Sequence, residues 1–135
     1  MCHCGKQEKL SDCCGRLIEG DDLADSAESL MRSRYSAFIE KKFEYLQETQ
    51  DPQTRSILDR AANEEFALAV EFSGLEILFS QEKENKAVVE FIASYRDLKT
   101  NELSKHHEVS QFRKQAGIWY YRQGKMQVKK QGKDK

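Results

Sequence analysis

The sequence predicts an α+β domain in which helices cover one face of a curved antiparallel sheet, with a small cysteine-rich segment in front. Residues 26–43 carry apolar side chains at helical spacing. The chain after Leu68 is instead rich in valine, isoleucine and phenylalanine, as strands are. All four cysteines fall within the first fourteen residues. Helices before strands, preceded by clustered thiols, favour one domain with a metal-binding attachment.

Length and composition describe one polar globular domain. The chain has 135 residues, 39% of them hydrophobic and 33% charged, which allows one real core and a short appendage. The apolar runs are too short to cross a bilayer, and the first ten residues lack the apolar segment of a secretory signal. We therefore expect a cytoplasmic protein that does not enter the membrane. A net charge of −1 gives no overall field that would attract nucleic acid.

The cysteines form two close pairs separated by eight residues. In a reducing compartment, clustered thiols are more often thiolate ligands than disulfides, and zinc takes four such ligands in a tetrahedron. Gly5 and Gly15 follow the two pairs, and we expect them to let backbone amides turn back toward the sulfurs. So short a segment cannot order itself by burial, so the metal must supply its folding energy. The cysteines are Cys2, Cys4, Cys13 and Cys14.

The first long helix is predicted at residues 26–43, SAESLMRSRYSAFIEKKF. Asp25 is its expected N-cap, and Glu28 three residues later completes a capping box. The helix is expected to join the cysteine cluster to the sheet, with its apolar stripe against the strands. That stripe consists of Ala27, Leu30, Met31, Arg34, Phe38 and Ile39.

The remaining elements follow from turn signals and periodicity. Asp51 and Pro52 are a favourable N-cap and first-position pair, which predicts a third helix that ends near Phe66. The charged turn 82–86 and the turn Ala116–Gly117 each separate two strands. The expected elements after the first helix are a short helix at 43–50, a helix at 52–66, and strands at 68–79, 87–95, 106–114 and 118–122.

The cysteine spacing and the glycines that follow it resemble the SEC-C zinc knuckle, a motif also found at the C-terminus of the SecA translocase. The stretch LMRSRYSAF at residues 30–38, with His107-Glu108 and Trp119-Tyr120-Tyr121, resembles the YchJ family of uncharacterised bacterial proteins over nearly the whole chain. The resemblance implies a nuclear transport factor 2-like (cystatin-like) domain. It also implies that one zinc ion is bound by Cys2, Cys4, Cys13 and Cys14.

The resemblance divides the chain into a knuckle at 1–20, an α+β domain at 21–125 and a basic flexible tail at 126–135. Several loop positions depart from the common knuckle pattern, although the cysteines do not. His3 as a replacement ligand, and redox chemistry at Cys13 and Cys14, are weaker alternatives. The departures are at His3, Lys6, Gln7 and Leu10.

A helix-covered curved sheet of this kind leaves a pocket between its two layers. Strand alternation puts His107 and Glu108 on opposite faces, so these neighbours cannot form one acid-base pair. Asp97 opposite His107 is a geometric alternative, and Arg34 is expected to pair with an acid such as Glu108 or Asp97, or to reach the knuckle. A structural role is favoured for these polar groups. The expected pocket residues are Arg34, Tyr35, Tyr95, His107 and Trp119, and the weak catalytic candidates are Tyr35, Asp97 and His107.

Three functions fit these features. The first is a zinc-binding adaptor, whose knuckle contacts a protein, or RNA or the ribosome, and whose α+β domain binds a ligand or second partner. The second is an acid-base enzyme of isomerase or dehydratase type that uses the pocket. The third is nucleic-acid binding through the knuckle and the basic tail. The open face of the sheet offers a surface for a homodimer.

Overall fold

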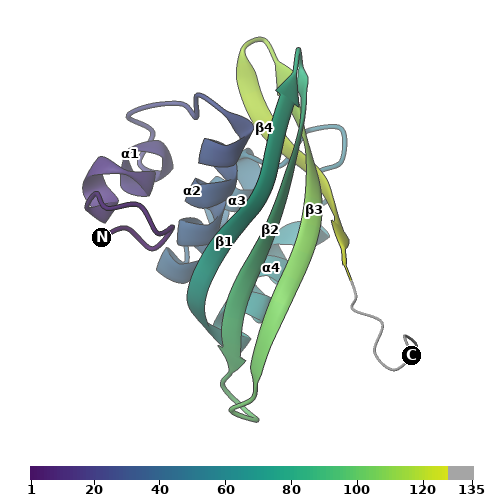
Figure 1. Ribbon diagram of the computed structural model, residues 1–135. Coiled ribbons are helices and arrows are strands. Elements are labelled where there is room, and N and C mark those ends of the chain that lie inside the picture. The colour runs from purple at the N-terminus through teal and green to yellow at the C-terminus, as the bar shows by residue number, and fades with distance from the viewer. Residues whose placement is uncertain (128–135) are drawn as a thin grey trace.

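The computed structural model describes residues 1–127 as two layers, with helices packed on one face of a four-stranded antiparallel sheet (Figure 1). This confirms the α+β prediction. The cysteine-rich segment lies beside α2, on the left of the view. In residues 1–127, no helix is long and apolar enough to span a bilayer. The elements are η1 (Leu10–Asp12), α1 (Cys14–Ile18), α2 (Ala27–Glu40), α3 (Phe43–Glu48), α4 (Leu58–Ala69), β1 (Val70–Lys83), β2 (Lys86–Asp97), β3 (Leu103–Gln115) and β4 (Ile118–Met126).

The strands form a meander in the order β1-β2-β3-β4, as predicted. The predicted turn at Ala116–Gly117 is confirmed, and both residues have the positive φ that a tight turn requires. The strands are longer than the sequence suggested, because β1 runs on to Lys83 and β4 to Met126. Of the expected tail at 126–135, residues 128–135 lie outside the described part of the chain.

The core lies between α2 and the inner face of the sheet. Alternate residues of β2 point into it, which is the period-two burial expected for a sheet covered on one side. Of the stripe predicted on α2, Ala27, Leu30 and Met31 are buried there, and Tyr35, which was not part of the predicted stripe, joins them. The buried cluster comprises Ala27, Leu30, Met31, Tyr35, Ala87, Val89, Phe91, Ala93, Phe112 and Trp119.

α2 begins one residue later than the predicted cap. Ser26, rather than Asp25, is the N-cap, and its hydroxyl accepts a hydrogen bond from the Ser29 N–H. The expected capping box with Glu28 does not form. Instead, Glu82 of β1 accepts from the Ala27 N–H, so the sheet itself satisfies a second amide at the helix start.

The predicted helix opening at Asp51 and Pro52 is wrong. α4 begins at Leu58, and Asp51 is a fully buried carboxylate that receives hydrogen bonds from Arg113 and Arg122 on the sheet. Its backbone N–H donates to the Tyr121 carbonyl, which fixes the loop against β4. The Asp51 carboxylate still accepts from the Gln53 N–H, as in a local cap, but its ion pairs with the two arginines hold this segment as a loop against β4.

Candidate metal centre

The two cysteine pairs come together in one small loop structure. The first pair sits in a tight turn closed by a bond from the Cys2 N–H to the Lys6 carbonyl, in which Gly5 takes the positive φ of 99°. The second pair starts α1, where the Cys13 N–H donates to the Leu10 carbonyl. As a result, the Sγ atoms of all four cysteines lie within 4.8 Å of one another. This arrangement can hold one metal ion.

Gly15 is required for a different reason from the predicted one. Its backbone does not have a positive φ; instead, a Cβ at this position would lie 2.6 Å from the Leu10 carbonyl oxygen. The absence of a side chain lets η1 and α1 approach closely, which brings the second cysteine pair over the first. Close packing, rather than backbone freedom, is what this glycine supplies.

The four thiols shift one another's pKa values. A hydrogen bond from the Cys14 thiol lowers the pKa of Cys4 to about 4, whereas burial raises the pKa of Cys13 to about 12. The hydrogen bond to Cys4, followed by burial, also raises the pKa of Cys14. One thiolate thus suppresses ionisation of its neighbours at this spacing. Four thiolates require a cation among them, which is the chemistry of a metal-thiolate centre.

The cysteine loop is clamped to the polar face of α2 by three contacts. The Arg32 guanidinium donates to the Cys4 carbonyl at 2.7 Å, and the His3 ring is 2.6 Å from a carboxylate oxygen of Glu40. Between them, the buried hydroxyl of Ser36 lies 3.7 Å from Cys2 Sγ. Positions 32, 36 and 40 are one turn apart, so they form one stripe along the helix.

The two sides of α2 have different partners. Its apolar side covers the sheet, and the opposite polar side holds the knuckle, so the helix joins the two parts as predicted (Figure 1). The His3 ring contacts the Glu40 carboxylate and lies outside the four-sulfur cluster. Leu75 of β1 packs against both the cysteine cluster and the main core, which gives the knuckle a second point of attachment.

The interior where a pocket was expected is filled. Tyr35 and Trp119 are buried at 3% and 4% exposure, and Phe91 of β2 packs in the same cluster. Three of the depressions on the surface of residues 1–127 have volumes of 450–550 Å³, and none of these side chains lines those three. The structure therefore does not assemble a pocket around Tyr35 and Trp119.

Arg34 is buried but does not make the expected ion pair. Its guanidinium donates to the Leu46 carbonyl and the Thr49 hydroxyl, and it stacks over the Tyr121 ring at 4.4 Å. Burial lowers its pKa. Arg34 thus ties α2 to α3 and β4, and Glu108 is reached only through Tyr121, whose hydroxyl donates to it.

The remaining candidates are far apart. His107 lies on the open face of the sheet, 2.7 Å from Glu90, and Ile92 rather than Asp97 is opposite it. Asp97 accepts hydrogen bonds from the amides of the turn after β2, while Tyr95 packs edge-on against aromatic rings on the inner face. The expected pairing of Asp97 with His107 is therefore wrong, because the register places them at different levels of the sheet.

A buried polar cluster around Glu108 was not predicted from the sequence. The carboxylate receives hydrogen bonds from the Tyr121 and Ser110 hydroxyls, and His106 lies 2.6 Å from its second oxygen. These contacts keep the pKa of Glu108 low although burial opposes them. Gly124 makes room for it, since a Cβ there would overlap the carboxylate. The only signal in the sequence was the alternation that put His106, Glu108 and Ser110 on one face.

The architecture and the site define the class of protein: a nuclear transport factor 2-like α+β domain with a cysteine knuckle docked on its first long helix. The family model described as "YchJ, middle NTF2-like domain" matches residues 26–124. The chain therefore belongs to the YchJ family.

Relatives and solved structures agree with this placement. A UPF0225 protein of Bordetella pertussis is 41% identical over 91% of this chain and 90% of its own length. A UPF0225 protein of Geobacter sulfurreducens is 37% identical over 92% of this chain and 78% of its own length. The solution structure of a SEC-C motif containing protein from Rhodopseudomonas palustris matches 94% of this chain and 98% of its own, with a TM-score of 0.87 and 41% identity. A SEC-C motif containing protein from Psychrobacter arcticus matches 93% and 77%, with a TM-score of 0.76 and 31% identity.

Proposed function

We propose that this protein is a cytoplasmic zinc-binding adaptor, in which a closed zinc centre shapes a surface for a partner protein. The observation that carries the proposal is the four-sulfur cluster clamped to α2. Zinc-sulfur bonds of about 2.3 Å place the sulfurs of a tetrahedral centre about 3.8 Å apart. The Cys4 and Cys13 sulfurs are 3.7 Å apart, and all four sulfurs lie within 4.8 Å of one another, spacings compatible with a tetrahedral thiolate centre of this size.

Four protein ligands leave no coordination position for a substrate, so the proposed role of the ion is structural. The residues that would hold it are all cysteines, the ligand type that favours soft or borderline cations. The Lys6 N–H stabilises the Cys4 thiolate, and the Ser36 hydroxyl lies beside Cys2. These neighbours orient the sulfurs and limit access of water to them.

Metal analysis tests the zinc centre. We expect native mass spectrometry of the full chain to show one zinc per molecule and few thiols that react with a thiol reagent. Cys4→Ser should lose the metal, whereas Ser11→Ala, on the same loop, should keep it. Less than about half an equivalent of zinc in metal-replete protein, with all four thiols reactive, would overturn the proposed centre.

The surface proposed for the partner lies where the knuckle meets the start of α2. A depression of about 550 Å³ is lined there by parts of both; most of its lining is charged or polar, and Leu17 and Leu23 are its apolar side chains beside Cys13. Leu23 is 68% exposed on this rim. An exposed apolar side chain beside a rigid metal-held loop suits a protein contact better than a small charged ligand. The order of this surface would depend on the zinc.

Site-specific crosslinking tests the contact. A photoreactive residue at Leu23 should give zinc-dependent protein adducts in cells, and the same residue at Leu103, 77% exposed at the far end of the sheet, should not. Combining the Leu23 probe with Cys4→Ser should remove the adducts. Equal labelling from Leu23 and Leu103, or adducts that survive Cys4→Ser, would reject the knuckle as the contact surface.

A further inference from the structure

A row of positive charges crosses the open face of the sheet near its hairpin end. In the strand register, Lys83 of β1 is opposite Lys86 of β2, which is opposite Arg113 of β3. Tyr120 of β4 continues the row beside Arg113. Like charges directly opposite one another destabilise a sheet. The row therefore weakens the fold slightly, and a bound anion would relieve the repulsion.

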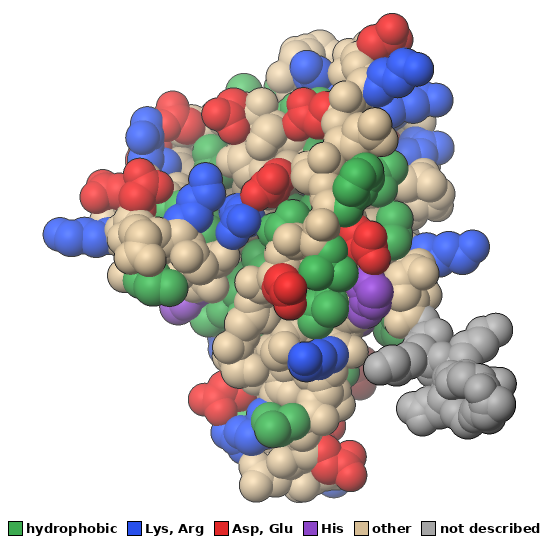
Figure 2. Space-filling model, viewed as in Figure 1, with side chains coloured by type: hydrophobic (Ala, Val, Ile, Leu, Met, Phe, Trp, Pro, Cys, Tyr) green, Lys and Arg blue, Asp and Glu red, His purple; other side chains and the backbone are tan. Residues whose placement is uncertain are grey.

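The row borders a depression of about 520 Å³ that is lined without any carboxylate among the described residues. Its four cations are Lys83, Lys86, Arg113 and Arg122. Blue side chains gather at the upper right of Figure 2, over this end of the molecule. Because the acidic residues that flank the row point elsewhere or are engaged, this surface retains its positive charge.

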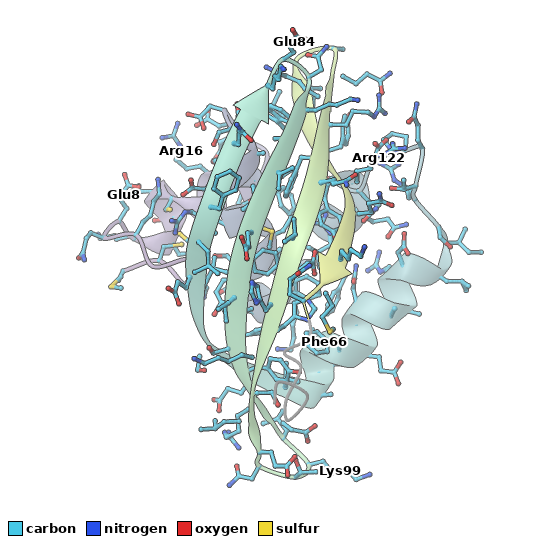
Figure 3. The ribbon with its side chains drawn as sticks, turned by 45° about the vertical axis from the view of Figure 1, so that its right-hand side comes forward. Glu8, Arg16, Phe66, Glu84, Lys99 and Arg122 are labelled. Carbon is cyan, nitrogen blue, oxygen red and sulfur yellow. The ribbon has the colours of Figure 1, made fainter. Side chains whose placement is uncertain are left out.

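Nearby acids do not cancel the charge. Glu82 is turned toward the helices, where it accepts from the Ala27 N–H, and Glu84 stands at the hairpin tip (Figure 3). Asp51 is buried and offers one negative charge to Arg113 and Arg122 together. It also holds both guanidinium groups in place, so the two arginines are preorganised and together keep one net positive charge.

A second row, parallel to the first, is built from amides. Gln81 lies opposite Val88, which lies opposite Gln111, and Gln111 lies opposite Gln123. Amide side chains both donate and accept hydrogen bonds, as nucleobase edges require. Beyond them on β1, Phe79 is 49% exposed on the same face, opposite Glu90, whose carboxylate contacts His107 at 2.7 Å. The surface thus combines cations, amides and an exposed aromatic ring.

We propose that this surface binds single-stranded nucleic acid, with its phosphates along the Lys83, Lys86 and Arg113 row. The row spans two strand spacings, about 10 Å, which is too wide for one phosphate group to contact in full. The adjacent amides and Phe79 suit bases better than they suit the carboxylates of an acidic peptide. The depression beside the row shares no lining residue with the depression at the knuckle, so the inference does not depend on the adaptor function.

Salt-dependent binding of a labelled single-stranded oligouridylate to the full zinc-loaded chain tests this inference. Fluorescence anisotropy should show binding at low salt that weakens as salt rises. Replacing both lysines in Lys83→Gln/Lys86→Gln should reduce the slope of log K against log salt by about 1.4, since each phosphate contact on a single strand contributes about 0.7. Both lysines are exposed, so the fold should survive the change.

A matched variant removes the same charge elsewhere. Lys99 and Lys105 are exposed near the opposite end of the sheet, where Figure 3 labels Lys99. Lys99→Gln/Lys105→Gln should leave the salt slope nearly unchanged. Equal loss in the two double variants would show that only net charge matters and would overturn the site. Absence of binding at low salt, or equally effective competition by a polyglutamate peptide, would also overturn it.

Discussion

The knuckle and the body of this protein differ in what they bury. The body places ten hydrophobic side chains in one cluster between α2 and the sheet, whereas the buried cluster of the knuckle consists of three cysteines. Burial of apolar area can order the first region but not the second. The knuckle instead has four clustered sulfurs and polar contacts to α2. Its order should therefore respond to metal and to single polar substitutions, while the body should respond to core volume.

Metal removal should give the largest difference between the two regions. Structural zinc in small motifs contributes about 10 kcal/mol or more. We expect chelation, or Cys4→Ser, to make backbone amides of residues 2–19 exchange at rates near those of an unfolded chain, while β2 and β3 stay protected. Hydrogen exchange with mass spectrometry measures both regions in one experiment. Protection of the knuckle that persists without metal would contradict this division.

Shortening a core side chain should destabilise the body and leave the metal bound to the knuckle. Phe112 is 2% exposed in the body, and Phe112→Ala should lower the free energy of unfolding by about 3–5 kcal/mol because it leaves a cavity. Urea denaturation measures the loss, and the variant should still bind one zinc. Leu103→Ala, at a 77% exposed position on the same strand, should change stability by less than about 0.5 kcal/mol. A loss of zinc in Phe112→Ala would show that the regions are coupled.

The body also contains a polar anchor whose contribution depends on pH. Hydrogen bonds from Arg113 hold the pKa of Asp51 well below its usual range. The ionised Asp51 carboxylate therefore stabilises the fold fully at pH values above about 4, the pKa of an unfolded carboxyl. This stabilisation is lost as the pH falls below that value. Asp51→Asn should lower the free energy of unfolding by about 1–3 kcal/mol at neutral pH. The difference from wild type should shrink near about pH 3. Glu102→Gln, on an exposed turn, should show no such trend.

A single clamp residue should loosen the knuckle without releasing metal. Arg32→Ala removes the hydrogen bond to the Cys4 carbonyl, which we expect to cost about 1.5 kcal/mol of docking. Knuckle amides should then exchange about tenfold faster while zinc stays at one equivalent. Arg32 also pairs with Glu28 one turn earlier, and Arg60→Ala breaks the same kind of pair, with Glu64 on α4, so it should leave the knuckle unchanged. Zinc loss in Arg32→Ala would show that docking and metal binding are one event.

The same contrast explains which features were predictable from the sequence. Clustered cysteines, helical periodicity and hairpin turns are local patterns, and they correctly predicted the order of elements and the proximity of the sulfurs. Asp51 was misjudged because its partners, Arg113 and Arg122, are more than sixty residues away. The Glu108 cluster depends on the β3–β4 register and on the irregularity between Gln111 and Phe112, neither of which is determined by local sequence.

The smallest predicted effect separates two adjacent residues at the start of α2. Ser26 accepts from the Ser29 N–H, so Ser26→Ala should lower the free energy of unfolding by about 1 kcal/mol. The sequence pattern predicted Asp25 as the cap, yet Asp25→Ala should change the free energy of unfolding by less than about 0.5 kcal/mol. Urea denaturation of the two variants decides between the two caps. A larger loss of stability in Asp25→Ala would show that Asp25, rather than Ser26, caps the helix.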